Sequence, residues 1–497
     1  MEKKSFKVII VGGSIAGLTL AHCLDRANID YVILERRAEV APQEGASLGI
    51  MPNGARILLQ LGIYNKLEEL IHPLTEAHLL YPDGFGFTSQ YPKLLRERFG
   101  FPLAFIDRQK VLELLGASLP SPDRLHVSTK VKQVEELADG GVRVHTGDGD
   151  CYDGNIVVGA DGVHSVVREE MWRLSGTSSA KITKDMQVQY ACVFGISSPL
   201  PNLPPGKQIT CYNKGWSILS VVGKNGRLYW FLFYKLDGKY NYTTAPRVST
   251  EDAIRRCSDL ASQPFWQHLS FGDVWGARER FNVTRLDEYV LPEWTHKNII
   301  CIGDSAHKIA PQTGQGANCA IEDATALANA LHQLLRGRDP STQPSPSELT
   351  NLLHNVAAER RTRMQGVVHS AKMSMRLQAL DGLLPRLVAR YYFPYAGDML
   401  ADLASKGIAD APLIDYIPVP ARSGPGWDTF GKKSNKQKNL KEKEHGKEKD
   451  HGKQNARAIS SWIATLASLA LVCLLWFPAH LSVLYRDVAR PLISINA

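Results

Sequence analysis

Three glycine-rich stretches, each directly after an apolar run, constrain this chain more than any other feature. They are Gly12-Gly13-Ser14-Ile15-Ala16-Gly17, then Gly159-Ala160-Asp161-Gly162, then Gly303-Asp304 followed by Gly314-Gln315-Gly316. One such stretch is a weak signal by itself. Three in a fixed order indicate strand ends gathered along one large dinucleotide wrapped by a single chain.

The first stretch lies in a predicted βαβ unit. Residues 6–11 are β-rich, residues 15–24 have the apolar spacing of a helix, and residues 31–34 form a second short run. Gly12 permits the tight turn from strand to helix, and Gly17 permits close packing of that helix on the strand. We expect the N–H groups and the dipole at the helix start to hold a pyrophosphate.

Two polar residues refine this nucleotide site. Ser14 replaces the usual second glycine, and its hydroxyl is able to donate to a phosphate. Glu35 ends the second strand, where a carboxylate accepts hydrogen bonds from the ribose hydroxyls of an adenosine. A carboxylate there disfavours a 2′-phosphate, so the resident nucleotide is FAD or NAD rather than NADP. The alternative is a chance glycine turn, which Glu35 argues against.

The third stretch indicates a flavin. Asp304 follows the buried run 299–302, at the strand end where α/β sheets place ligands, and is expected to accept from a ribityl hydroxyl. The helix that follows has a partly positive N-terminus. Aimed at the N1/C2 edge of an isoalloxazine, it would stabilise the anionic reduced flavin. The residues predicted to lie beside the isoalloxazine are Pro311, Gly314, Gly316 and Ala317.

Three further polar residues have competing interpretations. Arg108 begins a helical pattern and is expected to form a charge-assisted bond to the cofactor phosphate or ribityl chain, the alternative being a solvated surface charge. Asp161 either approaches the dinucleotide or caps the next helix, and the sequence alone does not decide. His307 is more simply a hydrogen-bonded turn histidine than a titrating group.

The predicted fold class is α/β, with a Rossmann-like FAD-binding domain, an inserted β-sheet substrate domain, a C-terminal helical region and a transmembrane tail. The strand-like runs 187–196, 217–222 and 227–235 define the insertion. The expected segments are 1–184 and 291–420 for the FAD-binding domain with its C-terminal helices, 185–290 for the substrate domain, 421–457 for a disordered linker and 458–485 for a transmembrane helix.

The C-terminal tail carries the prediction of a membrane anchor. Residues 458–485 contain no Lys, Arg, Asp or Glu, and about twenty apolar residues cross a hydrocarbon layer. The alternative is a helix docked on the enzyme. Residues 431–457 hold ten Lys/Arg against four Asp/Glu, which favours a cytosolic catalytic domain with a single-pass anchor. The expected organelle is the endoplasmic reticulum.

Charge and cysteine usage exclude several other classes. The net charge of +8 arises mostly in the linker, so nothing indicates a nucleic-acid surface. The eight cysteines show no CxxC pair and no His/Cys ligand spacing, so no metal site is expected. No apolar region with a cleavage site follows the N-terminus, so a cleaved signal peptide is not expected.

From residue 6 to about residue 363, the chain resembles the single-component FAD-dependent aromatic hydroxylase class. It is most similar to fungal FAD-dependent monooxygenases of indole-diterpene and meroterpenoid biosynthesis. The resemblance rests on Val11 to Leu18, on Leu48-Gly49-Ile50-Met51-Pro52-Asn53-Gly54, on Gly303 to His307 and on the apolar tail. It implies FAD contacts at Glu35, Gly49, Arg108, Asp304 and Ala317.

The resemblance also implies a reaction. NADPH would visit transiently, and the reduced flavin would react with O₂ to give a C4a-hydroperoxide. In this subfamily the hydroperoxide delivers its distal oxygen to a prenyl alkene, and a separate membrane cyclase later opens the epoxide. Since the oxygen chemistry belongs to the flavin, the protein orients the alkene and excludes water.

The insertion is dense in aromatic residues between 187 and 234, which suits a prenylated substrate, although an ordinary sheet core explains most of them equally well. Tyr212 is the predicted catalytic polar group near the reacting centre. Three alternatives to epoxidation remain: hydroxylation of an aromatic ring, a flavin reductase that never activates O₂, and a non-catalytic, membrane-tethered binding protein that kept the fold.

Overall fold

The computed structural model describes residues 6–43, 47–178, 183, 186–339 and 342–431. Every element below belongs to the first of two structural units, residues 1–434. The predicted transmembrane helix at 458–485 lies outside the described residues. Among the helices that the structure does describe, none combines the length and the apolar character needed to cross a membrane.

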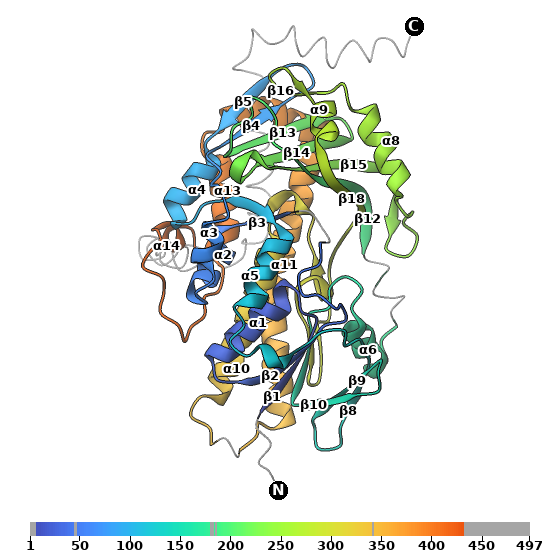
Figure 1. The fold of residues 1–497 in the computed structure, drawn as a ribbon, viewed down its shortest axis with the longest axis vertical. Helices are drawn as coiled ribbons and strands as arrows, with labels where there is room; N and C mark the ends of the chain where they lie inside the picture. Colours follow the sequence, from blue (N-terminus) through green and yellow to red (C-terminus); the bar gives the residue numbers. More distant parts are fainter. Residues whose placement is uncertain (1–5, 44–46, 179–182, 184–185, 340–341, 432–497) are drawn as a thin grey trace, which may run out of the picture. The chain divides into compact units, whose positions relative to one another are not determined.

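The part of the chain that carries the glycine-rich stretches is built on a six-stranded sheet (Figure 1). Its strands pair in parallel except for the edge pair β19–β20. Four of the five residues of β1 are buried because helices cover both faces of this central strand. In spatial order the strands are β19 (Thr295–His296), β20 (Ile299–Cys301), β11 (Ile156–Gly159), β1 (Lys7–Val11), β2 (Asp30–Leu34) and β7 (Leu125–His126).

The helices of this half come from segments before and after residues 187–290. The first βαβ unit forms as predicted, with α1 joining β1 to β2, and α1 packs against α10. A two-stranded ribbon of β3 (Ser47–Ile50) and β6 (Ala104–Asp107) places Gly49 opposite Phe105. The helices are α1 (Ile15–Arg26), α2 (Pro52–Gln60), α3 (Tyr64–Glu68), α4 (Tyr91–Phe99), α5 (Arg108–Ala117), α6 (Val166–Leu174) and α10 (Gly316–Leu335). A small antiparallel sheet holds β8 (Val131–Glu136), β9 (Val142–Thr146) and β10 (Cys151–Gly154).

The second half is an eight-stranded sheet (Figure 1). The three predicted runs of the insertion form strands of it, and one face packs on α8 (Thr250–Asp259) and α9 (Phe271–Gly276). Its order is β21 (His307–Lys308), β18 (Arg278–Val290), β12 (Gln187–Ser197), β15 (Leu228–Asn241), β14 (Trp216–Val222), β13 (Lys207–Asn213), β4 (Glu76–Leu80) and β5 (Gly86–Ser89). A separate small ribbon holds β16 (Pro264–Trp266) and β17 (Leu269–Ser270).

This sheet is not confined to the expected 185–290 segment. β4 and β5 come from residues 76–89, and β4 pairs in parallel with β13. β21, at residues 307–308, pairs with the end of β18. The pairing of β4 with β13 joins residues more than a hundred positions apart, so local sequence patterns did not reveal it.

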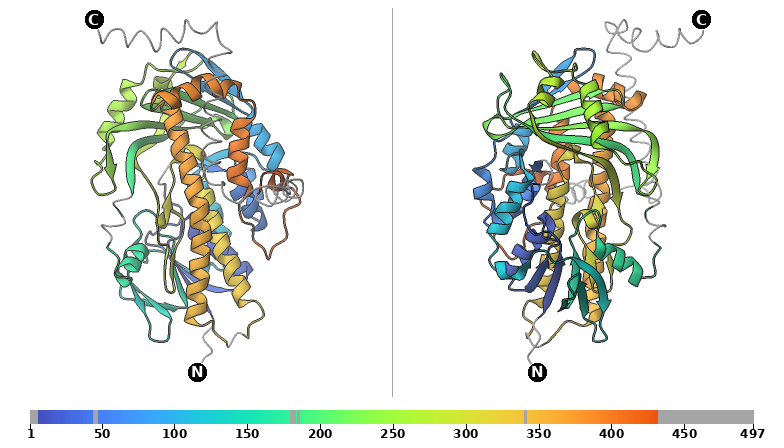
Figure 2. Two further views of the ribbon diagram at one scale, coloured as in Figure 1. Left: turned by 180° about the vertical axis from the view of Figure 1, so that it is seen from behind. Right: turned by 45° about the vertical axis from the view of Figure 1, so that its right-hand side comes forward.

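Long helices from the C-terminal part connect the two sheets. α11 (Pro346–Gln378) lies beside α10 and contacts strands of both sheets, as Figure 2 shows from behind. After it come α12 (Leu383–Leu387), the π-helical turn η5 (Val388–Tyr392), the 3-10 turn η6 (Phe393–Tyr395), α13 (Met399–Ala409) and α14 (Gly426–Phe430).

The predicted start of the disordered linker, residue 421, lies too early in the chain. The Trp427 ring packs on Phe99 with 4.9 Å between the ring centroids, and its indole N–H donates to the Phe99 carbonyl. The Arg422 guanidinium pairs with Glu68. Because these side chains bury or pair against the N-terminal half, the folded part extends through residue 431.

Candidate functional site

A cavity of about 1040 Å³ opens between the six-stranded sheet and β18. Every predicted cofactor residue except Gly17 lines it, so the three glycine-rich stretches meet around one space. These lining residues are Gly12, Ser14, Glu35, Gly49, Arg108, Asp161, Asp304, Pro311, Gly314, Gly316 and Ala317.

Close backbone contacts explain the first two glycines. Gly12 has a φ of +107°, and a Cβ on it would lie 2.4 Å from the Ala160 carbonyl oxygen. A Cβ on Gly17 would lie 2.0 Å from the Gly12 carbonyl oxygen. Gly17 therefore brings α1 onto β1 without reaching the cavity itself, which is the packing role that the sequence predicts.

Ser14 and Arg108 form one unit. The Arg108 guanidinium, at the first residue of α5, donates to the Ser14 hydroxyl over 2.7 Å. Since the hydroxyl accepts from arginine, its own proton is available to another acceptor. A cation and a donor hydroxyl therefore stand together at the start of α1, where an anion is favoured.

The Glu35 carboxylate is buried and held by backbone. One oxygen accepts from the Gly13 N–H at 2.7 Å, and the other accepts from the Arg37 N–H at 2.9 Å. An ionised carboxylate has about four acceptor positions, so both oxygens keep capacity for a ligand. The cations Arg36 and Lys130 line the same cavity.

The Asp161 side chain caps a helix. Its oxygens accept from the Ser165 hydroxyl at 2.5 Å and from the Val166 N–H at 2.7 Å, at the start of α6. Burial raises the pKa of Asp161. Of the two interpretations that the sequence left open, capping is the one that these hydrogen bonds support for the carboxylate, while the residue still lines the cavity.

The loop from Gly303 to Ala317 forms another wall of the cavity. Asp304 lines it, and its carbonyl accepts from the Tyr289 hydroxyl at 2.7 Å. α10 begins at Gly316, so its N-terminal N–H groups open toward the same space. The Asn318 amide donates to the carbonyls of Gly49 and Gly314, which joins β3 to this wall.

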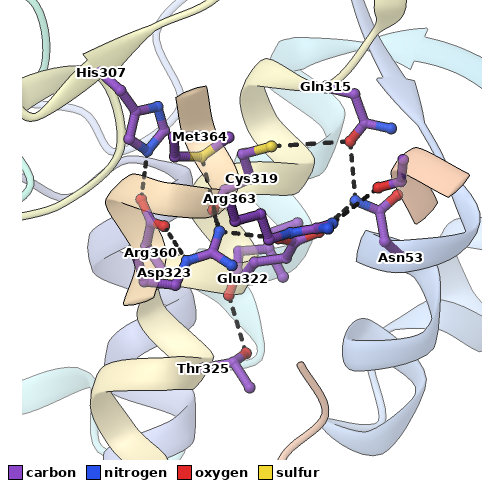
Figure 3. Close-up of polar contacts among 12 residues, drawn as sticks. Asn53, His307, Gln315, Cys319, Glu322, Asp323, Thr325, Arg360, Arg363 and Met364 are labelled. Atoms are coloured by element: carbon purple, nitrogen blue, oxygen red, sulfur yellow. Dashed lines mark hydrogen bonds and ion pairs between the residues drawn. The ribbon is translucent and has the colours of Figure 1, made fainter. Parts of the chain in front are cut away.

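A buried ion network lies directly behind this wall (Figure 3). Glu322 and Asp323, adjacent on α10, both bind Arg360 of α11, at 2.9 and 2.7 Å. Arg363 adds a second cation to Glu322 at 2.6 Å. These four side chains are about one-tenth exposed or less.

The network holds both ends of the loop. Asp323 accepts from the Gly303 N–H at 2.9 Å and pairs with His307 at 2.6 Å. Glu322 accepts from Asn53, whose amide also donates to Gln315. Burial alone would raise the pKa of Asp323, but His307 and Arg360 hold it at about 2. The carboxylates therefore stay charged and fix the loop in place.

Comparison with known proteins identifies the family. The family described as "FAD binding domain" matches residues 5–370. The FAD-dependent monooxygenase cdmI of Talaromyces verruculosus is 53% identical over 441 residues, covering 88% of this chain and 92% of that protein. The FAD-dependent monooxygenase paxM of Penicillium paxilli is 45% identical over 438 residues, covering 87% and 91%.

The chain belongs to the FAD-dependent monooxygenases. Its predicted similarity to the fungal enzymes of indole-diterpene and meroterpenoid biosynthesis is confirmed, and so is FAD as the cofactor. Among solved structures, that of Klebsiella pneumoniae HpxO complexed with FAD and uric acid matches with a TM-score of 0.67 and 21% identity. The match covers 82% of this chain and 97% of that one, and it supports the fold alone.

The cavity of this monooxygenase fits FAD. Its volume is at the upper end of the range of about 300–1,000 Å³ for small-molecule pockets. A Cβ added at Gly162 or Gly316 would meet no protein atom within 4 Å, so the backbone there borders open space. Cations and N–H groups line part of the cavity, whereas Phe105 and Phe231 line another part.

Sequence reasoning missed the ion network of the monooxygenase and Asn318. The only available signal was the pair of adjacent carboxylates, Glu322 and Asp323, inside an otherwise apolar helix. Their partners lie almost forty residues away on α11. His307 is hydrogen-bonded through Nε2, in agreement with the simpler of its two interpretations.

Tyr212 does not line the cavity. Its ring stacks on Tyr81 at 5.0 Å between the centroids, in a small cluster that also contains Leu79, Leu380 and Ala389. Burial, followed by the neighbouring Tyr81 and Tyr91, raises the pKa of Tyr212 well above its ordinary value. Its catalytic role stays a prediction that the cavity geometry does not favour.

The aromatic residues of the insertion divide between the two faces of the sheet. Phe231 lines the cavity, and Phe233 stacks on it at 6.1 Å. Trp230 and Tyr234 belong instead to the core under α8 and α9. Part of the aromatic density is therefore ordinary sheet core.

Proposed function

We propose that this monooxygenase epoxidises a prenyl alkene of a terpenoid or meroterpenoid intermediate in secondary metabolism. One atom of O₂ enters the alkene, the other leaves as water, and NADPH supplies the two electrons. FAD, when bound, supplies both electron transfer and oxygen activation. A protein nucleophile is not required.

The observation that carries this proposal is the composition of the cavity. A cofactor-binding part with Glu35, Ser14 and Arg108 continues into a region lined by Phe105, Phe231, Val283 and Ile309. An apolar wall next to a flavin site suits an alkene and excludes water. Arg285, Asp287 and Lys308 line another part of the same cavity and provide polar groups there.

The protein residues have binding and orienting roles in this proposal. Glu35 accepts from ribose hydroxyls, Arg108 and Ser14 bind phosphate oxygens, and Asp304 accepts from the ribityl chain. The N–H groups that begin at Gly316 would stabilise negative charge on FAD at this end of the cavity. Cavity-lining cations are complementary to the phosphates of both FAD and NADPH.

The rest of the proposal concerns location and partners. The tail at 458–485 anchors the enzyme in the endoplasmic reticulum membrane, with the catalytic domain in the cytosol. A prenylated substrate partitions into that membrane, and a membrane cyclase consumes the epoxide.

The test is expression of the full chain in microsomes with a panel of prenylated phenols and prenylated indoles. NADPH and ¹⁸O₂ should give products with one labelled oxygen on the prenyl group. Label on the aromatic ring would support the second candidate, ring hydroxylation, and overturn epoxidation. NADPH consumption without labelled product would instead indicate a reductase.

A control variant separates these results from loss of the protein. Asp304→Ala should lose bound flavin and product together while the protein stays folded. Product formation by the colourless protein would contradict a flavin mechanism.

A further inference from the structure

Exposed apolar side chains gather in one short segment of the chain. Tyr395 is 65% exposed, Leu383 62%, Leu384 57% and Leu403 53%. The other exposed large apolar residues are spread over the rest of the chain, at Leu70, Val127, Ile254, Met373 and Val419. Single exposed apolar residues are ordinary, whereas a concentration of them marks an interaction surface. We call the surface of residues 383–403 the leucine patch.

The backbone of the leucine patch is fixed to the large sheet. The Tyr81 hydroxyl donates to the Ala389 carbonyl at 2.5 Å. Arg390 lies over the Phe85 ring at 3.8 Å and pairs with Asp83. Leu380 and Leu400 pack into the same cluster as Tyr81. These contacts hold η5 and the start of α13 in place, so the exposed apolar side chains before and after η5 lie beside a structured support.

Positive charge surrounds the patch. Arg376, Arg386 and Lys406 are exposed, and none of them has an ion pair among residues 6–431 as described. Of three nearby acids, Asp381 pairs with Lys235 and Asp402 pairs with Arg98, whereas the exposed Asp398 has no ion pair among the described residues. The three cations therefore outnumber the one unpaired carboxylate. Exposed leucines flanked by unpaired cations are typical of segments that lie in the plane of a membrane interface.

We propose that the leucine patch docks the catalytic domain on the headgroup region of a bilayer containing anionic phospholipid. Charge complementarity selects this occupant. The uncharged segment 458–485 has no carboxylate to pair with the three cations. A second copy packed symmetrically would bring like charges together. Lipid phosphates and acyl chains match both features. This contact is separate from the predicted anchor and does not depend on the flavin chemistry.

The experiment uses the full chain, reconstituted in vesicles of phosphatidylcholine and phosphatidylserine. Because the tail by itself would hold the protein on vesicles, binding is not informative and probe depth is measured instead. A thiol-reactive fluorophore is attached at Leu384→Cys, at Leu403→Cys or, as a matched control, at Val127→Cys. Cys151, which is exposed, and Cys473 are first replaced by Ser and Ala.

Lipids with a nitroxide near the headgroup should quench the probes at 384 and 403 and leave the probe at 127 bright. Arg376→Glu with Arg386→Glu should weaken the quenching about tenfold when phosphatidylserine is present. Equal quenching at 127 and 384, or none at either, would overturn the proposal. So would shielding of the probe at 384 without lipid that disappears when residues 458–485 are deleted, or disulfide cross-linking between two copies of the Leu384→Cys variant.

Discussion

The middle and the C-terminal end of α11 contact the rest of the protein in opposite ways. At its middle, Arg360 and Arg363 meet Glu322 and Asp323 in a buried network with matched charges. Near its C-terminus, the helix passes Glu288 of β18, which has a buried oxygen without a hydrogen-bond partner among the described residues. The first contact fixes the cavity wall, whereas the second leaves one oxygen of Glu288 without a partner, although Asp381, just after the helix, pairs with Lys235 of the sheet.

This difference indicates where precision is needed. The loop behind the proposed flavin site is fixed at Gly303 and His307 by the Asp323 carboxylate. It is fixed at Gln315 by the amide of Asn53, which itself donates to Glu322. The sheet side combines apolar residues such as Phe231 and Val283 with the ion pair of Arg285 and Asp287.

The largest expected effect comes from removing Arg360 from the buried ion network. Arg360→Met leaves two buried carboxylates short of a partner, which costs about 3–5 kcal/mol in the free energy of unfolding. Arg361→Met, one residue along the same helix, should change it by less than about 0.5 kcal/mol. Urea denaturation of both variants measures the difference. Equal losses would mean that the network does not stabilise the fold.

Substitutions of two cavity aspartates should affect different quantities, FAD affinity in one case and stability in the other. Asp304→Ala removes a predicted acceptor for the ribityl chain and should weaken FAD binding about ten- to a hundredfold. The apo protein should be almost as stable as wild type. Asp161→Ala removes a helix cap and should lower apo stability by about 1 kcal/mol instead. Flavin fluorescence titration and urea denaturation together test this, and the reverse pattern would contradict the assignment.

The buried Glu288, beside the C-terminal end of α11, predicts that the free energy of unfolding depends on pH. Burial raises the pKa of Glu288 from 4.5 to about 7. The pKa of Glu288 is higher in the folded protein than in the unfolded chain. Its contribution to the stability of the folded protein is therefore complete below pH 4.5 and is lost as the pH rises through 7. Glu288→Gln should therefore be about 1–2 kcal/mol more stable than wild type at about pH 8 and similar to it at about pH 4. Unchanged pH profiles would show that Glu288 is solvated.

The smallest effect is expected at Tyr212. Since it lies outside the cavity, Tyr212→Phe should leave kcat/KM almost unchanged and stability within about 1 kcal/mol. Tyr81→Phe, which removes the hydroxyl that donates to the Ala389 carbonyl, is measured beside it for the same two quantities. A drop of about a hundredfold or more in kcat for Tyr212→Phe alone would restore the catalytic role predicted from the sequence.

The sequence predicted what local backbone rules determine. Gly12, Gly17 and Gly303 must adopt turns or close approaches that few other residues allow, and that requirement is visible in the chain itself. Tyr212 was predicted to lie near the reacting centre, but it lies outside the cavity. The alternation of side chains along a strand does not reveal which neighbouring element covers each face. The Arg360 network and the pairing of β4 with β13 join distant residues, for which one sequence offers no local signal.

The central claim is that FAD lies in the cavity formed by the three glycine-rich stretches. A crystal structure of the purified, yellow full chain tests it most directly. The account predicts the adenosine beside Glu35, the pyrophosphate at the start of α1 near Ser14, and the isoalloxazine between Pro311 and the N-terminus of α10. A flavin bound elsewhere, or protein side chains filling the space beside Pro311, would contradict it.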